Sequence, residues 1–362
     1  MNSKDRVKKI LSHTNADRIP RDFWTTAQTD KNLINMLEVN NREEILKLFK
    51  IDFRHLQGPR YIGPMLKKLP DGTFEDIWGT LFKNEYIKVN NNVENVINII
   101  NSPLSKFETL NDIKKYKHWP SPDWFDYSSI LEQCENNNND KVLVFTGDRL
   151  NRVCQLKTAI YLRGMDNFLI DMYLNEKIFS HIISKIKEFY CEYMMRILKA
   201  ANGKIDIFMT GDDFGMQRNT IMDNRDWKKH FKPGFKKYID IIHDFNVMAM
   251  HHSCGSIYKL IPEFIDCNLD ILQSLQPDAG EMNFKKIKKT YGKFISFQGG
   301  IGIQKNLPFG KPEDIKIEVK NIMNIMKENG GYIACTAHNI QADTPYINII
   351  SLIEAYDKYG KY

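Results

Sequence analysis

The sequence of 362 residues lacks the patterns that mark several large classes of protein. No apolar run approaches the about 20 residues that a membrane-spanning helix needs, and no internal repeat is evident. No basic cluster is interleaved with aromatic residues, so the net charge of +6 predicts a solvated surface and no nucleic-acid partner. No GxGxxG follows the first apolar run, which leaves a dinucleotide site without support.

Cysteine is scarce, and its positions form no CxxC pair. The six cysteines are Cys134, Cys154, Cys191, Cys254, Cys267 and Cys335. Irregular spacing in a chain of this size predicts free thiols or a few metal ligands, and it argues against a disulfide framework. The first residues, MNSKDRVKKILSH, are charged and contain no apolar signal region. We therefore expect a cytoplasmic protein with no membrane partner.

From residue 141 onward, short apolar runs alternate with helical segments. The runs are residues 141–147, 204–215, 246–255, 269–277, 293–302 and 332–338. Continuous apolar runs are typical of strands buried on both faces, and their alternation with helices predicts a parallel sheet. With two further units from residues 45–100, the pattern predicts an α/β fold of the (β/α)8 TIM-barrel type. We expect one domain over residues 1–362, with an N-terminal extension over about residues 1–45.

Polar residues follow the apolar runs at the points where the expected strands end. In a (β/α)8 barrel the carboxyl ends of all strands meet at one mouth, which is where active sites lie. His252 and Cys254 follow one strand, and Cys335 and His338 mark the end of the last one. The barrel therefore predicts that these four residues share a cleft, although they lie far apart in the sequence.

The stretch MHHSCGSI allows three interpretations: a metal site, a cysteine nucleophile with a histidine base, or a buried strand end. His252 and Cys254 are two positions apart and point to the same side of an extended segment. Imidazole nitrogen and thiolate sulfur suit Zn²⁺. A third ligand from Cys335 or His338 would leave one coordination position open, as in catalytic zinc sites. His251 points the other way, so we expect it in the core or behind the ligands.

Other polar residues at the strand ends are candidates for catalysis or binding. Asp212 and Asp213 are adjacent, so only one faces the cleft, as an acid or base, a zinc ligand or a support for a ligand histidine. A helix N-cap is the alternative interpretation. His338 is also a candidate catalytic base. Arg149 is expected to bind a substrate carboxylate or to form a surface salt bridge, and Gln298 is a candidate cofactor-binding residue.

Several motifs, in order along nearly the whole chain, resemble the uroporphyrinogen decarboxylase superfamily. They are DRVKKILSHTNADRIPRDF, FEDIWG, TGDDFGMQ, HHSCGSIYKLIPEFIDCNLDIL, YGKFISFQGGIG and GGYIACTAHNIQADTPYINI. The HSCG and TAHNIQADTP motifs are similar to the corrinoid-linked branch, which includes the methylcobamide:coenzyme M methyltransferases. The resemblance implies a (β/α)8 barrel and a zinc ion held by an HxC pair and a later third ligand.

The sequence departs from the family pattern in two places. The RQAGR motif of true decarboxylases, whose arginines hold propionates, is absent; that region contains Arg18 and Arg21 and reads PRDFWTTAQTD. Porphyrin decarboxylation is therefore not expected. The methyltransferases place their late cysteine just before a TP turn. Counted back from Thr344-Pro345, that position is His338, and Cys335 lies three residues earlier, so either residue completes the ligand set.

The resemblance implies a zinc-dependent methyltransferase that moves a methyl group between a corrinoid and a thiol or another small acceptor. The corrinoid would be a substrate carried by a small partner protein, because this chain lacks the DxHxxG cobalamin-binding pattern. The alternative is a metal-free decarboxylase of a small or tetrapyrrole acid, which predicts an arginine-lined pocket. A third possibility, a non-catalytic barrel that binds a corrinoid or a partner, predicts bound cobalamin without turnover.

Overall fold

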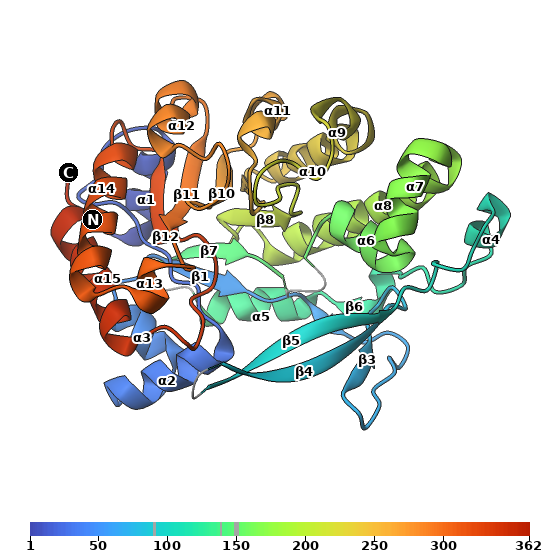
Figure 1. Ribbon diagram of the computed structural model, residues 1–362, viewed down its shortest axis with the longest axis horizontal. Coiled ribbons are helices and arrows are strands. Elements are labelled where there is room, and N and C mark those ends of the chain that lie inside the picture. Colours follow the sequence, from blue (N-terminus) through green and yellow to red (C-terminus); the bar gives the residue numbers. More distant parts are fainter. Residues whose placement is uncertain (90–91, 138–139, 148–151) are drawn as a thin grey trace.

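A computed structural model describes residues 1–89, 92–137, 140–147 and 152–362. Its centre is a curled sheet of seven strands in the order β1, β7, β8, β9, β10, β11, β12 (Figure 1). These strands are β1 (Phe53–Leu56), β7 (Val142–Phe145), β8 (Ile207–Gly211), β9 (Met248–His252), β10 (Ile271–Leu275), β11 (Ser296–Ile301) and β12 (Tyr332–Thr336). All neighbours pair in parallel, so the predicted α/β class and parallel sheet are confirmed.

The six apolar runs predicted after residue 140 each contain one of these strands. Every residue of β7, β8, β10, β11 and β12 is buried. Side chains that alternate along the strands pack outward on helices or inward on each other, which explains why both faces are apolar. The inward cluster contains Val7, Trp24, Phe53, Val142, Val144, Ile207, Met209, Met250, Ile271, Ile333 and Cys335.

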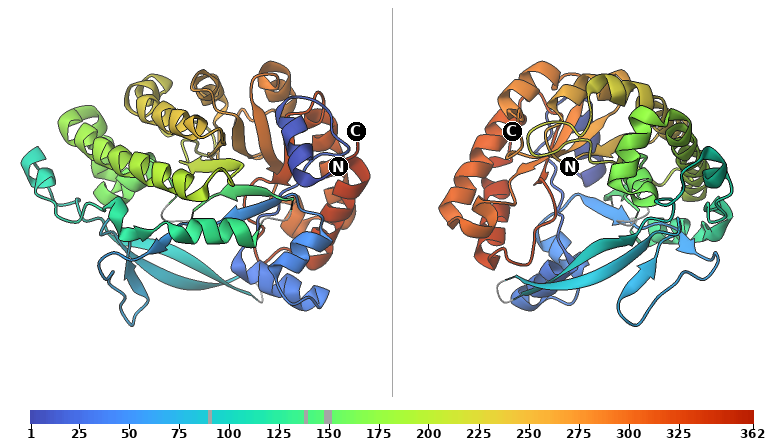
Figure 2. Two further views of the ribbon diagram at one scale, coloured as in Figure 1. Left: turned by 180° about the vertical axis from the view of Figure 1, so that it is seen from behind. Right: turned by 45° about the vertical axis from the view of Figure 1, so that its right-hand side comes forward.

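The expectation of two barrel strands from residues 45–100 is correct for only one. β1 joins the parallel sheet, whereas β3 (Thr73–Glu75), β4 (Leu81–Val89) and β5 (Asn92–Asn101) form a separate antiparallel sheet. The described residues therefore contribute seven strands of the expected eight. Polar residues interrupt the apolar ones in LFKNEYIKV, as in a hairpin with one face in solvent, so this segment cannot be buried on both sides. Figures 1 and 2 show the β4–β5 hairpin on the side of the molecule away from α9–α12.

An extended segment, residues 20–26, lies beside the outer strand β12. The Asp22 N–H donates to the Ala334 carbonyl at 2.9 Å. The Asp52 N–H, just before β1, donates to the Arg21 carbonyl at 3.0 Å. The segment therefore forms hydrogen bonds with β12 and with the residue just before β1, the two outer strands of the sheet. Its Trp24 side chain belongs to the inward cluster of the curled sheet.

Helices surround the sheet (Figures 1 and 2). They are α1 (Ser3–Leu11), α2 (Ala27–Leu37), α3 (Arg42–Leu48), α4 (Leu110–Lys114), α5 (Ser128–Asn136), α6 (Leu156–Arg163), α7 (Met165–Leu174), α8 (Glu176–Ala201), α9 (Asn224–His230), α10 (Lys232–Asp244), α11 (Ile261–Asp266), α12 (Phe284–Tyr291), α13 (Asn306–Phe309), α14 (Pro312–Met326) and α15 (Tyr346–Tyr359), with 3-10 turns at Pro122–Trp124 and Tyr258–Leu260. A two-stranded ladder pairs β2 (Arg60–Tyr61) with β6 (Phe125–Asp126). Among the described helices, none has the length and apolar character needed to cross a bilayer.

Candidate functional site

Three donor side chains meet beyond the carboxyl ends of β9 and β12. His252 is the last residue of β9, Cys254 follows it, and His338 lies just beyond Thr336 at the end of β12. One ligand atom from each of the three residues lies within 4.8 Å of the other two. Residues two apart on an extended segment project to the same side, which explains why the side chains of His252 and Cys254 lie next to each other. The structure thus gathers three of the residues predicted as metal ligands.

Cys335, the other predicted third ligand, lies apart from this group. Its side chain is 0% exposed and belongs to the inward apolar cluster with Trp24 and Ile333. Burial raises the pKa of its thiol well above the usual value. Among the residues that the structure describes, the group of potential metal ligands contains His338 and does not contain Cys335.

Two neighbours hold the ring of His252 in place. Its Nδ1–H donates to the amide oxygen of Gln273, the residue paired with it on β10. Its ring stacks on the indole of Trp24, with 6.1 Å between centroids and 13° between planes. Because Nδ1 is bonded to Gln273, Nε2 faces Cys254, whose Sγ lies 3.4 Å away. This arrangement leaves Nε2 as the nitrogen that can bind a metal.

Cys254 and Asp213 lie beside the imidazole of His252. Burial lowers the pKa of an imidazole, but Cys254 and Asp213 outweigh this effect and raise the pKa of His252 to about 10. The Oδ1 atom of Asp213 lies 3.4 Å from His252 Nε2 and accepts the Cys254 N–H at 2.9 Å. Imidazole and thiolate side chains in this arrangement could hold a metal ion in place of the proton on His252.

The adjacent aspartates point in different directions, as their spacing predicts. The carboxylate of Asp212 is buried and accepts the backbone N–H groups of residues 155, 156 and 157 at 2.6, 3.1 and 2.8 Å. These groups belong to the start of α6, so Asp212 caps that helix. Burial raises the pKa of Asp212 to about 6, although the three N–H bonds act in the opposite direction. Asp213 is the member of the pair that contacts His252 and Cys254.

His251 lies on the other side of β9, among apolar rings. Its Nδ1 is 2.8 Å from Thr210 Oγ1, and its ring packs against Phe214, Phe235 and Phe264. Burial lowers its pKa to about 3, so the ring is neutral at ordinary pH. His251 is therefore a core residue, as the alternation of side chains along the strand predicts.

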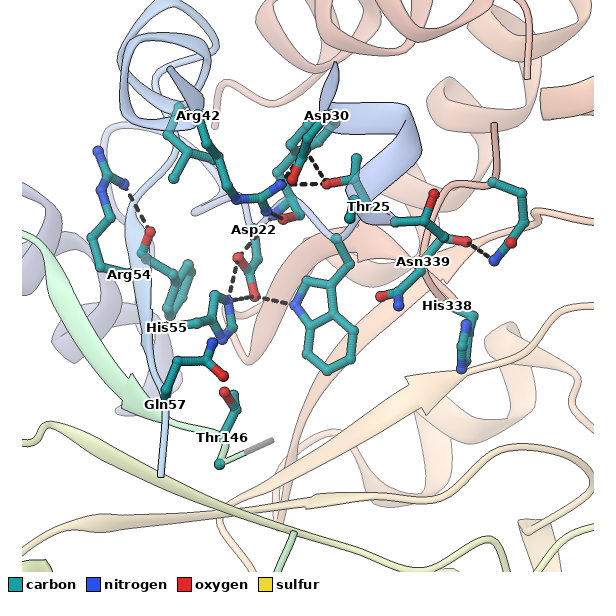
Figure 3. Close-up of a pocket in the computed structure, with 18 of the residues that line it drawn as sticks. Asp22, Thr25, Asp30, Arg42, Arg54, His55, Gln57, Thr146, His338 and Asn339 are labelled. Carbon is teal, nitrogen blue, oxygen red and sulfur yellow. Dashed lines mark hydrogen bonds and ion pairs between the residues drawn. The ribbon is translucent and has the colours of Figure 1, made fainter. Parts of the chain in front are cut away.

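A cavity of about 960 Å³ has His338, one of the three donors, in its wall. The other walls come from residues 22–27, α3, β1 and the β4–β5 hairpin. Figure 3 shows Asp22, Arg42 and His55 from the first three of these segments. The ionisable residues that line the cavity are Asp22, Asp30, Arg42, Glu43, Arg54, His55, Arg152, His338 and Asp343. Six of these are paired, Arg42 with Asp30, Arg54 with Glu43 and His55 with Asp22. The guanidinium of Arg152 lies over the Trp24 ring, 5.8 Å from its centroid.

The remaining predicted residues lie in different environments. Gln298 is fully buried on β11, and its Nε2 donates to Asp22 Oδ2 at 2.7 Å. It therefore supports a residue of the cavity wall, and its binding of a cofactor stays a prediction. Arg149 lies outside the described residues.

Four residues of the site were not found by sequence analysis: Asp22, Trp24, His55 and Gln273. Asp22 and Trp24 belong to PRDFW, which carries neither a strand nor a helix pattern. Gln273 is a polar residue inside an apolar strand, and its position there was the signal that could have marked it as part of the site. A buried amide in such a strand needs a hydrogen-bond partner, here His252.

Comparisons with known proteins agree with this fold. Residues 153–359 match the family model described as "Uroporphyrinogen decarboxylase (URO-D)". No curated protein matches the sequence significantly. A methyltransferase from Methanosarcina mazei is similar in structure, with a TM-score of 0.66, 16% identity and 99% of each chain covered.

Two other solved structures are much less similar. A pneumococcal exo-beta-D-N-acetylglucosaminidase module has a TM-score of 0.42 and 13% identity, over 97% of this chain and 86% of the other. A sugar phosphate isomerase/epimerase from Parabacteroides distasonis has a TM-score of 0.40 and 10% identity, over 95% and 96%. Neither bears on function, and the likeness to the methyltransferase concerns the fold alone.

Proposed function

We propose that this chain, which belongs to the uroporphyrinogen decarboxylase family, is a zinc-dependent methyltransferase. It would move a methyl group between a corrinoid, brought as a substrate by a small partner protein, and a thiol or another small acceptor. The observation that carries this proposal is the group of His252, Cys254 and His338 beside a cavity of about 960 Å³. The fold shared with a methyltransferase from Methanosarcina mazei is consistent with it.

The three side chains fit a zinc ion by their chemistry. Two imidazoles and one thiolate are typical zinc ligands, and three protein ligands leave one position for a substrate. Two ligand atoms of one zinc ion lie at most about 4.6 Å apart, because zinc–ligand bonds are about 2.0–2.3 Å long. The three donor atoms lie within 4.8 Å of one another, so a small approach of the side chains would let them share an ion. We therefore propose His252, Cys254 and His338 as the ligands, and Cys335 as a packing residue of the interior.

Bound Zn²⁺ would supply a Lewis acid that lowers the pKa of an acceptor thiol. The chain prepares this position with its own side chains. Gln273 fixes the ring of His252, and Asp213 holds the backbone of Cys254. His338 is exposed toward the cavity, so a small substrate can approach the ligands from there. The buried Trp24 covers His252 on one side and limits the access of water.

The alternative activity, decarboxylation of a tetrapyrrole or small acid, receives less support. Arginines that hold substrate carboxylates must face the cavity. Arg18 instead pairs with Asp52 and Arg21 with Asp357, each at 2.8 Å. Neither arginine is among the residues that line the cavity. Of the arginines that do line it, Arg42 and Arg54 are paired with Asp30 and Glu43, and Arg152 lies over the Trp24 ring.

Metal analysis of the purified chain tests the proposed ligands. Chelator-treated protein should rebind one zinc ion per chain, and Cys254→Ser and His338→Ala should each weaken binding by at least about 100-fold, since each removes a direct ligand. Cys335→Ser is the matched control and should bind zinc like the wild type. Retention of zinc by His338→Ala together with its loss in Cys335→Ser would show that the assignment of the third ligand is wrong.

Turnover is tested separately, with methylcobalamin as the methyl donor and 2-mercaptoethanol as the acceptor. Zinc-loaded protein should form cob(I)alamin and the methyl thioether, and the metal-free protein should not. A wild-type chain that binds no zinc and transfers no methyl group to thiol, phenol or folate acceptors would overturn the proposed function.

A further inference from the structure

A second polar cluster, centred on Asp22, is built into the wall of the cavity. The Asp22 carboxylate is buried and accepts hydrogen bonds from Trp24 Nε1 and Gln298 Nε2, both at 2.7 Å. The Phe23 N–H donates to it at 2.8 Å. Burial tends to raise the pKa of a carboxyl group, but His55 and these donors hold the pKa of Asp22 below its usual value. Asp22 is therefore an anion held in place by its own segment, by β11 and by β1.

His55, on β1, completes the cluster. Its Nε2 lies 2.9 and 3.0 Å from the two carboxylate oxygens of Asp22. A carboxylate can only accept a hydrogen bond here, so the neutral ring carries its proton on Nε2 and its lone pair on Nδ1. No described residue forms a hydrogen bond with Nδ1. The side chain is 22% exposed and lines the cavity (Figure 3).

Trp24 joins this cluster to the three donors. The ring of His55 meets the indole edge-on at 5.6 Å, and His252 stacks on the same indole at 6.1 Å. Figure 3 shows His55 and His338 at the same cavity, on walls from β1 and from the loop after β12. One cavity therefore has a group suited to a metal ion and, separately, an imidazole backed by a carboxylate.

Other charged groups around the cavity have different contacts. Arg152 lies over the Trp24 ring, Asp343 lines the loop after β12, and Arg42–Asp30 and Arg54–Glu43 are ion pairs. Among the described residues, Asp22 is the carboxylate that bonds to the ring of His55. The charge that forms when His55 takes a proton is therefore compensated mainly by Asp22.

We propose that His55 and Asp22 form a proton-transfer pair for a substrate in this cavity, and that this substrate is an acceptor with an ionisable thiol or hydroxyl group. The inference rests on the proposed methyl transfer and adds the class of the acceptor and the base that activates it. His55 is the residue that contacts the substrate. Asp22 is a positioning residue, which fixes the tautomer of His55 and stabilises the imidazolium, as a carboxylate does in hydrolytic triads.

In the direction of acceptor methylation, the S–H or O–H bond breaks, its electron pair stays on the heteroatom, and the proton passes to Nδ1 of His55. The heteroatom then forms a bond to the methyl carbon, and the corrinoid substrate keeps the electron pair of the cobalt–carbon bond that breaks. In the reverse direction His55 returns the proton to the heteroatom that loses its methyl group.

Nitrogen NMR of the histidine rings tests the pair without turnover. The zinc-loaded full chain is labelled with ¹⁵N-histidine, and the His55 signals are assigned by their loss in His55→Gln. We expect the Nε2–H tautomer for neutral His55 in the wild type, and a larger share of the Nδ1–H tautomer in Asp22→Asn. A wild-type ring in the Nδ1–H form would overturn the proposal, because Nδ1 would then have no lone pair to accept a proton.

The pH profile of methyl transfer from methylcobalamin to 2-mercaptoethanol tests the catalytic role. The wild type should lose kcat at acid pH, because a protonated base cannot take the proton of the acceptor. His55→Gln should lower kcat by about 10²–10⁴-fold, with little change in KM, and should lose this acid limb. Asp22→Asn should lower kcat by a smaller factor. A matched control is His243→Gln, which removes another His–Asp pair, with Asp270 at 2.7 Å, away from the cavity lining.

The outcomes separate this inference from the proposed function. If His55→Gln binds zinc and keeps both kcat and the acid limb, the base assignment is wrong and the methyltransferase assignment stands. If the wild type neither binds zinc nor transfers methyl groups, the methyltransferase assignment fails, and with it the role of His55 in that reaction. Imidazole added to a folded His55→Gly variant should restore part of the rate, which a merely structural residue would not do.

Discussion

The ring of His252 donates from Nδ1 to the amide oxygen of Gln273, its partner where β9 pairs with β10. This contact leaves Nε2 directed at Cys254, 3.4 Å from its sulfur. A single amide on the neighbouring strand therefore decides which nitrogen of His252 is offered to a metal ion.

The Gln273 contact predicts an effect on metal affinity. Gln273→Leu should weaken zinc binding about 10–100-fold, because partners that orient a ligand histidine typically contribute this much. Competition with a chromophoric chelator measures the change. Gln133→Leu is the control, since the Gln133 amide on α5 accepts the N–H of Gln57, just after β1, at 2.8 Å and should not affect zinc. Equal affinity in the wild type and Gln273→Leu would contradict the orienting role.

Cobalt(II) substitution should report the number of thiolate ligands. With His252, Cys254 and His338 as ligands, the spectrum should show the charge-transfer intensity of one cobalt–thiolate bond. Cys335→Ser should leave this spectrum unchanged, and Cys254→Ser should abolish the thiolate band. Intensity for two thiolates, halved in Cys335→Ser, would place Cys335 on the metal.

Asp212 should contribute to stability through its cap of α6. Asp212→Ala removes an acceptor from three backbone N–H groups and should destabilise the protein by about 2–4 kcal/mol, because buried donors lose their partners. Asp223→Ala is the control. Asp223 caps α9 through one N–H, that of Arg225 at 2.8 Å, so its loss should cost about 1 kcal/mol of stability. Urea unfolding measures both, and an equal cost would contradict the special role of Asp212.

The buried His251 should make the protein sensitive to acid. Its pKa is lowered to about 3 in the folded protein, so between that value and its ordinary pKa the unfolded chain binds more protons. Stability is therefore lost as the pH falls below about 6.5, by about 2 kcal/mol between pH 7 and pH 5. His251→Phe should unfold with a shallower dependence on pH over this range. Parallel pH profiles in urea unfolding would show that His251 is not the group responsible.

The strands after residue 140 could be predicted because each is a continuous apolar run that is buried on both faces. The hairpin of β4 and β5 was misassigned to the barrel because apolar content alone does not separate a solvent-covered antiparallel strand from a buried parallel one. The burial pattern of its residues, and not their number of apolar side chains, carries that difference.

The pairing of His252 with Cys254 follows from the sequence, since alternation along an extended segment places residues two apart on one side. Which late residue lies beside them depends on the packing of β12. Cys335 is within β12 and packs inward, whereas His338 follows the end of that strand and reaches the cavity. The contacts of Asp22 with His55 and Gln298, which are 33 and 276 positions away, also depend on the tertiary structure. No local pattern encodes these contacts, because they arise only when the segment at residues 20–26 lies beside β12 and next to β1.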